Sequence, residues 1–506
     1  MLHFTWLDIS VFVIYLLATT AIGLLFTNEQ DDLGEYFLAG RSMGRIVIAM
    51  TILAALFSGI SFLASPSEGY SNGLAFYLVN IGFFVATPVT TLLFLPFFYH
   101  SRFFTAYQYL EERFSVQVRT LASGSFIIRV LLWLALATYA PALALEQATG
   151  LPLWFTIICT GLLTTFYTTL GGMKAVIWTD VMQLGVLFGG QLLIAISAIS
   201  RIPGGISGVA SIARDGGRLD LSTSFDPTVR VTLWGLLLGS AFMHLVQMAT
   251  DQVSVQRYLT AKSLKEAQRG LWLKLWLVLP VTAVFYGTGV VLYAYYQVHG
   301  DPLAAGKISR PDQILPYFVV TELPSGFPGL FIAAIYAASM STISAGINSL
   351  TSASLIDFYQ RLWKNPDLSD QTQLRLARRL TIIYGLLVVL LAFFVKRLGT
   401  LLEASNSIIS LVGGPLLGLF LLGILVPRAT ARGALFGWGA GVAVLLPICF
   451  ATQVSFLWYA MIGCLVTIAT GSLVSLLEPP PAFEQIDNLT WSTLKAEESE
   501  SVQQPA

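Results

Sequence analysis

The stretch Ala54-Ala55-Leu56-Phe57-Ser58-Gly59-Ile60-Ser61-Phe62 decides the fold, because small and polar residues interrupt an apolar run there. Glycine and serine lower helix stability and compete for backbone hydrogen bonds, and Pro66 follows shortly after. A helix break at Ser58-Gly59 would free carbonyl groups, which a membrane tolerates only beside a cavity or a bound ion. The alternative is that the small residues allow two helices to approach closely.

The composition places the whole chain in a membrane. It has 506 residues, of which 55% are hydrophobic and 11% charged, with a mean hydropathy of +0.73. Average soluble proteins carry about 25% charged residues, so a soluble globule, a disordered chain and a disulfide scaffold are excluded. The 28 Lys and Arg balance the 28 Asp and Glu, so no basic bias towards nucleic acid exists. Three cysteines in apolar runs are expected to act as small hydrophobic residues: Cys159, Cys449 and Cys464.

Many apolar stretches are long enough to be transmembrane helices. A helix needs about 20 residues to cross the roughly 30 Å hydrocarbon core. The runs are continuous rather than alternating, which predicts helices and not an outer-membrane barrel. About 13 such stretches are predicted, at 6–26, 46–65, 74–98, 122–145, 152–170, 175–200, 231–250, 271–298, 327–356, 380–396, 404–426, 433–452 and 455–477.

The loop charges predict the orientation. An odd number of crossings places the two termini on opposite sides. With the N-terminus outside, about two thirds of the 28 Lys and Arg residues fall in inner loops, as the positive-inside rule requires. We therefore predict a multi-pass protein of the plasma (cell) membrane, with the N-terminus outside and the C-terminus cytoplasmic. The tail from Glu478 is rich in proline and then in polar residues, which predicts a solvated end.

The run 337–349 is unusually rich in hydroxyl groups for a membrane span. Ala338, Ser341 and Thr342 are spaced i, i+3 and i+4, so they share one helix face, which Ser344 extends. A backbone carbonyl and two hydroxyls are hard, neutral oxygen ligands, which suit a small monovalent cation better than a soft transition metal. The alternative is that the hydroxyls bond back to the preceding turn.

Asp180 is a carboxylate just inside an apolar span. Inserting such a group costs of order 2.5–3.5 kcal/mol at the helix centre. Gln183 follows at i+3 and can face the same cavity. A position near a helix N-terminus would lower the cost through the helix dipole. We predict a functional role for Asp180, and the alternative is a structural partner at the helix N-terminus.

Two other spans contain polar side chains. His244, Gln247 and Thr250 recur about once per helical turn and precede Asp251, which indicates either an interrupted helix or an ordinary helix end with a polar cap. Arg129 lies within an apolar span. It either anchors an anionic substrate or, as we favour, snorkels or pairs with a carboxylate.

The spans also show a pseudo-symmetry. Without the first span and the last two, ten remain, and they divide into two sets of five. An odd number of spans inverts the second set relative to the first, and each set begins with an interrupted helix. This pattern is typical of inverted-repeat secondary transporters, whose site lies at the midplane. The predicted parts are a first helix and cytoplasmic loop (1–44), a first repeat (45–200), an outer loop and second repeat (201–426), two extra helices (427–477) and a cytoplasmic polar tail (478–506).

Four segments, in order along residues 35–427, resemble the sodium/solute symporter family. They are 35–44 (EYFLAGRSMG), 171–180 (GGMKAVIWTD), 250–258 (TDQVSVQRY) and the hydroxyl-rich run 337–349. The resemblance implies an all-α integral membrane protein with a LeuT-like core of five plus five helices. One extra helix precedes this core and two follow it, and sodium drives alternating access.

The same resemblance implies ion ligands. A main sodium site would use the carbonyl groups of Ala54, Phe57 and Ala338 and the hydroxyl groups of Ser341 and Thr342. Some members hold a second sodium ion through the aspartate that matches Asp180 and through hydroxyls near Ser341 and Ser344. Where those members have a further serine, this chain has Ala345. The sodium ion is the only cofactor that the resemblance implies.

The solute is predicted from two further segments. Residues 139–145 (YAPALAL) and 412–420 (VGGPLLGLF) are most similar to the branch that carries iodide, monocarboxylates and anionic vitamins. We therefore predict sodium-coupled import of a small organic anion, monocarboxylate-like or vitamin-like. A sugar or sialic acid symporter is the alternative within the family, and an ion channel is the alternative from another class. The solute is expected near Ser58, Ser61, Phe76, Asn80 and Gln247.

Other classes of function have little support in the sequence. The four histidines are scattered along the chain, so no catalytic set is predicted and an enzyme is not expected. A channel would need a repeated ring of carbonyl or charged groups, and no such motif is visible. The expected partners are the solute, sodium and the lipid bilayer, without nucleic acid.

Overall fold

The computed structural model describes residues 5–100, 103–362, 369–395 and 401–494. Its regular structure is helical, and within these ranges the one extended pairing is a single bridge between Met43 and Ala261. The longer helices are α1 (Trp6–Leu25), α3 (Arg45–Leu56), α4 (Gly59–Asn72), α8 (Val116–Thr149), α9 (Leu153–Ile199), α13 (Leu264–His299), α15 (Phe327–Ala353), α17 (Asp370–Ala392), α18 (Leu401–Leu425), α19 (Ala431–Ala451) and α20 (Tyr459–Leu476).

Shorter helices and turns extend or connect these elements. The short α-helices are α2 (Leu33–Leu38), α5 (Gly82–Val89), α6 (Leu95–His100), α7 (Gln108–Arg113), α10 (Gly205–Asp215), α11 (Ser240–Leu245), α12 (Gln252–Leu259), α14 (Ile314–Glu322) and α16 (Gln360–Leu362). π-Helical turns are η4 (Thr90–Phe94), η5 (Gly235–Gly239), η6 (Val246–Thr250) and η8 (Ser354–Tyr359). The sequence analysis did not predict the separate helices α2, α7, α10 and α14.

Helix lengths and hydropathy agree with a multi-pass membrane protein. Within the described ranges, eight helices are long and apolar enough to cross a bilayer, and the pair α3 and α4, bent by 67°, makes a ninth. Helix α9 has 47 residues and covers two predicted spans, which meet at Gly172, where φ is 55° and ψ is −154°. Apolar stretches at 235–250 and 410–425 are shorter. The count of about 13 crossings stays a prediction.

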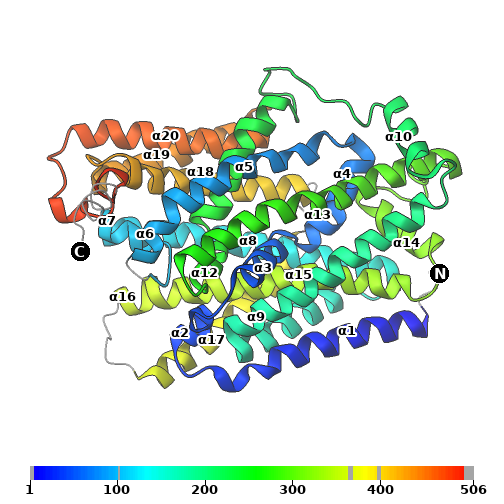
Figure 1. Cartoon of the computed structure of the whole chain (residues 1–506), viewed down its shortest axis with the longest axis horizontal. Coiled ribbons are helices and arrows are strands. Elements are labelled where there is room, and N and C mark those ends of the chain that lie inside the picture. The colour runs from blue at the N-terminus through cyan, green and yellow to red at the C-terminus, as the bar shows by residue number, and fades with distance from the viewer. Residues whose placement is uncertain (1–4, 101–102, 363–368, 396–400, 495–506) are drawn as a thin grey trace, which may run out of the picture.

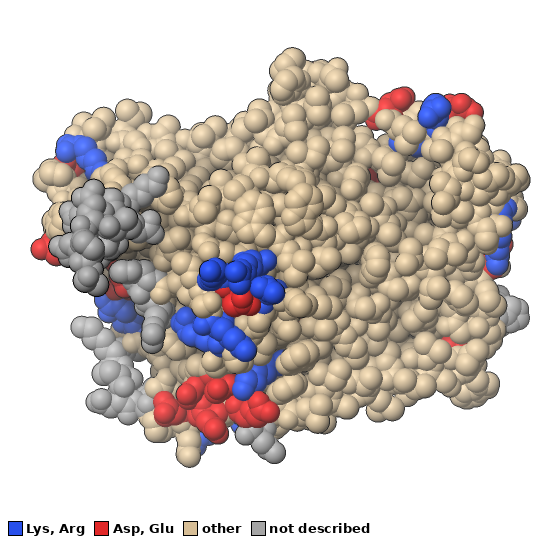
Figure 2. Space-filling model, viewed as in Figure 1, with Lys and Arg blue, Asp and Glu red and all other residues tan. Residues whose placement is uncertain are grey.

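The bundle has the charge distribution expected for a membrane. On the face shown in Figure 2, a broad band carries no Lys, Arg, Asp or Glu, and the charged side chains gather on either side of it. Helix α1 begins at one end of the bundle, and α20 and the segment after it finish at the other (Figure 1). This arrangement agrees with an odd number of crossings. The three cysteines form no disulfide.

Helix α15 is the centre of the bundle. All but a few of its side chains are buried, and it packs against α8, α9, α1 and α17, and also against α3 and α4. At its contact with α4, a Cβ atom on Gly59 would lie 2.0 Å from Ser339 Oγ. A larger residue there would force the Ser339 hydroxyl to move, so the small residues at 58–61 both break a helix and allow a close helix contact.

The segment after α20 differs from the solvated tail that the sequence predicts. Leu489 and Thr490 are buried, and the Tyr109 hydroxyl of α7 donates a hydrogen bond to the Leu489 carbonyl at 2.8 Å. The sequence did not predict this contact, because the residues that make it are single residues within a polar and charged segment. The predicted tail residues from 495 lie outside the described residues.

Candidate ion and solute site

The predicted helix break is present between α3 and α4. Phe57 (φ −93°, ψ 95°) and Ser58 (φ −86°, ψ 168°) have extended backbones, and α4 begins at Gly59. Ala54 and Phe57 lie buried at this helix end. The Ala54 carbonyl accepts the Phe57 N–H at 3.2 Å, and the last carbonyl groups of a helix lack the i+4 partner of the helix interior. The Ser58 hydroxyl accepts a hydrogen bond from the Ser61 N–H at 3.3 Å and so caps α4. Ser58 therefore stabilises the break.

Helix α15, which carries the hydroxyl face, packs against both helices of this break. Ala338, Ser341 and Thr342 are all buried on one continuous helix, and that helix contacts both α3 and α4. Thr342 Oγ1 has no hydrogen-bond partner among the described residues, although a threonine within a helix usually bonds back to the preceding turn. The Ser344 hydroxyl does bond back, to the Ser341 carbonyl at 3.0 Å. Thr342 thus keeps a buried oxygen free for a ligand.

Asp180 is fully buried and joins four helices. It accepts hydrogen bonds from the Ser341 hydroxyl of α15 and the Thr51 hydroxyl of α3, both at 2.5 Å. Its Oδ2 lies 2.9 Å from Nη2 of Arg257 in α12, whose Nε also donates to Thr51 Oγ1 at 3.0 Å. The charge of Asp180 is therefore compensated by Arg257.

One expectation about Asp180 needs correction. It lies eight residues after Gly172, the turn of α9, so the helix dipole is not its main partner. Gln183 has a partner of its own, because its Nε2 donates to the Tyr15 hydroxyl at 3.3 Å, and a shared cavity with Asp180 stays a prediction. Arg257 was part of a quoted motif, but nothing in the sequence shows which carboxylate it meets. Ser341 donates its proton to Asp180, and this bond leaves the lone pairs of its oxygen unused.

A cavity of about 120 Å³ lies beside the α3–α4 break. Four of the five residues expected near the solute line it, namely Ser61, Phe76, Asn80 and Gln247, while Ser58 does not. Its remaining wall is formed by Leu56, Phe57, Ser65, Val79, Phe83, Met243, His244, Val278, Thr282 and Tyr286. The cavity is therefore lined by both interrupted helices and by α13. The sequence analysis did not place α13 at the site.

A second helix break lies at Asp251 (φ −85°, ψ 117°), between η6 and α12. Its Oδ1 accepts the Val253 N–H at 3.0 Å, which caps α12, and its Oδ2 lies 2.7 Å from Nη2 of Arg129. Both sequence interpretations thus hold for this segment, an interrupted helix and a polar cap. Arg129 pairs with a carboxylate, as favoured above. Thr250 bonds back to the Val246 carbonyl at 2.9 Å.

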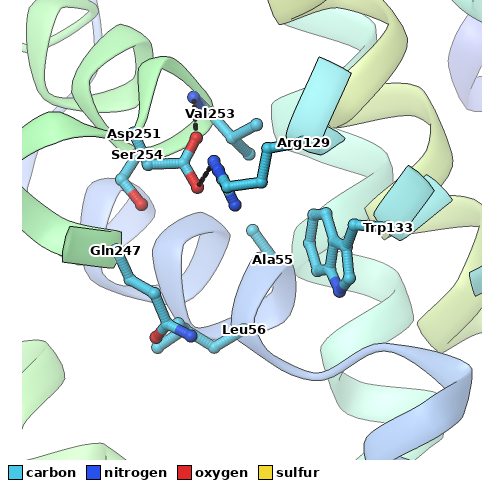
Figure 3. Close-up of a pocket in the computed structure, with 8 residues that line it drawn as sticks. All are labelled: Ala55, Leu56, Arg129, Trp133, Gln247, Asp251, Val253 and Ser254. Atoms are coloured by element: carbon cyan, nitrogen blue, oxygen red, sulfur yellow. Dashed lines mark hydrogen bonds and ion pairs between the residues drawn. The ribbon is translucent and has the colours of Figure 1, made fainter. Parts of the chain in front are cut away.

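The Arg129–Asp251 pair lines a separate cavity of about 40 Å³ (Figure 3). Arg129 and Trp133 project from α8 towards Asp251 and the end of α3. The walls of this cavity are Ala55, Leu56, Arg129, Trp133, Gln247, Asp251, Val253 and Ser254. Leu56 and Gln247 belong to both cavities, so these two side chains separate them.

Lys274 of α13 is a buried basic side chain that the sequence analysis missed. Its Nζ lies 3.2 Å from the centre of the Phe83 ring, and among the described residues it forms no ion pair with a carboxylate. The His244 ring stacks on Phe83 at 3.5 Å, and both rings line the larger cavity. The signal was a lone lysine in the apolar stretch 271–298, since charged residues inside spans are costly and commonly functional.

Interrupted helices that meet a hydroxyl-lined helix beside a central cavity define a secondary transporter. The model of the sodium:solute symporter family matches residues 36–441, and the chain belongs to this family. It is a sodium-coupled transporter and not an enzyme, as predicted.

Similar proteins support the same assignment. The chain is 37% identical to sodium-coupled monocarboxylate transporter 1 of Homo sapiens, over 88% of this chain and 74% of that protein. It is 36% identical to a putative sodium-dependent multivitamin transporter of Drosophila melanogaster, over 88% of this chain and 74% of that protein.

Solved structures confirm the fold. A Na⁺-coupled sialic acid symporter in a substrate-bound outward-open state has a TM-score of 0.86 and 31% identity, covering 94% of this chain and 99% of that one. Mhp1, a nucleobase-cation-symport-1 family transporter, has a TM-score of 0.55 at 15% identity, covering 91% and 98%. The predicted all-α, LeuT-like fold is thus confirmed.

Proposed function

We propose that this symporter imports a small monocarboxylate together with one sodium ion. The named relatives include monocarboxylate and multivitamin transporters, which supports an organic anion. The cavity and the buried charges around it support a particular size, charge and ion count for the transported solute.

The size of the cavity favours a short acid. An engineered cavity of about 150 Å³ binds benzene, a ligand of six heavy atoms. The cavity here, at about 120 Å³, therefore fits about five or six non-hydrogen atoms, as in propionate, lactate or pyruvate. A vitamin or a sialic acid is several times larger and would need a considerable expansion of the site. The apolar wall, with Phe57, Phe76 and Val278, suits a short hydrocarbon end.

Lys274 is the observation that carries the anion assignment. The other buried charges near the cavity are compensated, since Arg257 pairs with Asp180 and Arg129 with Asp251. Lys274 is a buried basic group with no carboxylate in contact among the described residues, and an anion bound nearby would stabilise its protonated, charged form. A buried charge is costly unless another charge compensates it. A bound monocarboxylate would supply one negative charge across the Phe83 and His244 rings, whereas a neutral sugar would not.

We propose that the sodium ion binds where the break meets α15. Its ligands would be the carbonyls of Ala54, Phe57 and Ala338 and the hydroxyls of Ser341 and Thr342. The unpartnered oxygen of Thr342 supports this site, and these neutral hard oxygens suit the ion. The ion would bridge the interrupted helix to α15 and so favour one conformation, by as much as its affinity differs between conformations.

We infer a single sodium ion rather than two. A second ion would need Asp180 and Ser344, but Asp180 already pairs with Arg257 and Ser344 bonds back within α15. One sodium ion with one monovalent anion moves no net charge, so the membrane potential supplies no driving force. A tenfold sodium gradient then contributes about 1.4 kcal/mol, enough for about tenfold accumulation.

The orientation completes the proposal. We propose that the protein lies in the plasma membrane with the N-terminus outside and the C-terminus cytoplasmic, on the charge bias of the loops. Helices α3 and α12 then lie between the cavity and the cytoplasm, and Met43 and Ala261 form their bridge at the cytoplasmic ends of these helices.

The test is uptake into proteoliposomes under an inward sodium gradient. Radiolabelled propionate should accumulate above its external concentration and saturate, and uptake should fall to background when potassium or choline replaces sodium. Propionamide, which has the same shape without the charge, should not be transported. Glucose and sialic acid serve as further solutes. Accumulation of either instead of propionate, or equal uptake without sodium, would refute the proposal, and uptake that only equilibrates would indicate a channel.

A further inference from the structure

Arg129 lies in a cavity of its own, next to the cavity proposed for the solute. We propose that this small cavity is a second binding site, which takes the carboxylate group of the substrate on its way to the cytoplasm by displacing Asp251 from Arg129. The inference rests on the proposed function, because it assumes an anionic substrate.

The guanidinium of Arg129 has unused hydrogen-bonding capacity. The residue is 1% exposed, and its one ion pair places Nη2 2.7 Å from Asp251 Oδ2. Yet neither Nε nor Nη2 has an acceptor in hydrogen-bond geometry among the described residues. A guanidinium offers five N–H donors in a planar fork that matches a carboxylate. Buried donors are normally satisfied, so a buried arginine with free donors facing a cavity indicates a ligand.

The dimensions of the cavity match one carboxylate group. A water molecule needs about 10–15 Å³ of such space, so a volume of about 40 Å³ holds about three waters, or a carboxylate and its first carbon. The site is too small for a whole substrate. It would therefore take the charged end, while the rest of the molecule stays between Leu56 and Gln247, the two side chains that line both cavities.

Asp251 is placed to exchange with the substrate. Its Oδ1 accepts the Val253 N–H at the start of α12, and only Oδ2 contacts Arg129. Asp251 can thus leave Arg129 and still cap its helix. A substrate carboxylate offers Arg129 the same chemical group as Asp251. One ion pair would therefore replace another, and the guanidinium would not be left without a counter-charge. Because Asp251 lies at the helix break, a tilt of α12 would also separate it from α8 (Figure 3).

The position of the cavity gives the order of events. The end of α3 and Gln247 contribute to both cavities, but the Arg129 cavity is otherwise lined by α8 and the start of α12, whereas the larger cavity is otherwise lined by α4, the segment 76–83, α11 and α13. In the proposed orientation, the Arg129 cavity lies on the cytoplasmic side of the larger one. The anion would reach it second, just before release.

The experiment compares four variants of the full-length transporter in nanodiscs and proteoliposomes. Asp251→Asn keeps a helix-capping side chain but removes the competing charge. Arg129→Gln/Asp251→Asn removes both members of the pair without leaving a buried charge, and Arg129→Gln alone removes the anion-binding group. Asp357→Asn is the matched control, because Asp357 forms a buried ion pair with Arg119 at 2.7 Å and lines neither cavity.

Two quantities are measured for each variant, with propionate as the probe and propionamide as its neutral counterpart. Thermal stabilisation by propionate in sodium gives the Kd, and release from preloaded liposomes gives the efflux rate. Asp251→Asn should bind propionate at least tenfold more tightly and release it at least tenfold more slowly. The double variant should lose that gain, and Arg129→Gln should bind more weakly than wild type. Propionamide should show none of these effects, and Asp357→Asn should not tighten propionate binding.

A structural pair would give a different pattern. If Asp251→Asn weakens propionate binding or leaves it unchanged, or if the double variant also binds more tightly, the Arg129 site does not exist and the inference fails. If wild type still shows sodium-dependent propionate binding, the proposed function stands although the inference fails. If wild type shows no such binding, the proposed function itself fails, and the inference fails with it.

Discussion

Replacing Lys274 by methionine tests the charge assigned to the solute cavity. Methionine keeps an unbranched apolar chain of similar length and removes only the ammonium group. Lys274 and His244 occupy opposite faces of the Phe83 ring, at 3.2 and 3.5 Å from it, which places the ammonium about 7 Å from the His244 ring. A carboxylate in the cavity beside His244 would lie about 8 Å from the charge.

The size of the effect follows from this distance. Two unit charges about 8 Å apart interact by about 2 kcal/mol at an effective dielectric constant near 20, which corresponds to roughly a thirtyfold change in affinity. Lys274→Met should therefore raise the Kd for propionate roughly thirtyfold. It should also raise the melting temperature of the substrate-free protein, because burying an amine without a compensating charge destabilises the fold.

The assay is thermal stabilisation in nanodiscs, titrated with propionate in sodium and repeated with Lys274→Arg. The arginine variant keeps the charge, so it should retain most of the affinity. A variant that binds propionate more weakly but melts at a higher temperature than wild type would indicate that the lysine is retained for ligand binding and not for stability. If Lys274→Met binds propionate as tightly as wild type, Lys274 does not compensate the substrate, and the anion assignment loses its main support.

Four further predictions concern the ion site and the ion pairs. Thr342→Val should lower the apparent sodium affinity at least tenfold while hardly changing the melting temperature without sodium, because its hydroxyl has no hydrogen-bond partner among the described residues; unchanged sodium dependence would remove Thr342 from the site. Asp180→Asn and Arg257→Met should each lower stability by about 3–5 kcal/mol, and the double variant should recover part of it; additive losses in a melting experiment would contradict the pairing. Propionate uptake should not respond to a potassium–valinomycin potential, since one sodium ion and one anion carry no net charge; a current would indicate more than one sodium ion. Burial raises the pKa of Glu111, but hydrogen bonds from two arginines outweigh burial and hold that pKa below 4.5. The resulting stability is present above about pH 4.5 and is lost as the pH falls through the folded-state value, so melting of Glu111→Gln should depend less on acid than melting of wild type.

The fold class was predictable because a bilayer enforces simple rules. A span must be long, apolar and helical, so length and hydropathy alone indicate a multi-pass helical protein. The interruption at Ser58-Gly59 was predictable for the same reason, since small polar residues at that depth are costly unless they break a helix or approach another one. The structure shows both effects, with a 67° bend and Ser339 against Gly59.

The candidate site was only partly predictable. Periodicity placed Ala338, Ser341 and Thr342 on one face, because residues three and four apart are neighbours on any helix. Four of the residues expected near the solute do line one cavity. Ser58 does not, because its hydroxyl caps α4 instead. A serine that caps a helix and a serine that lines a cavity cannot be told apart in the sequence. The roles of these residues in binding stay predictions.

What the sequence determined by itself is everything that depends on neighbours along the chain: the apolar spans, the helix breaks and the shared faces. What only the tertiary structure decided is how the buried charges pair. Asp180 meets Arg257 across 77 positions, Arg129 meets Asp251 from another helix, and Lys274 meets a phenylalanine ring instead of a carboxylate. Charges interact through space with whichever group lies closest, and helix packing, rather than order in the chain, determines which group that is.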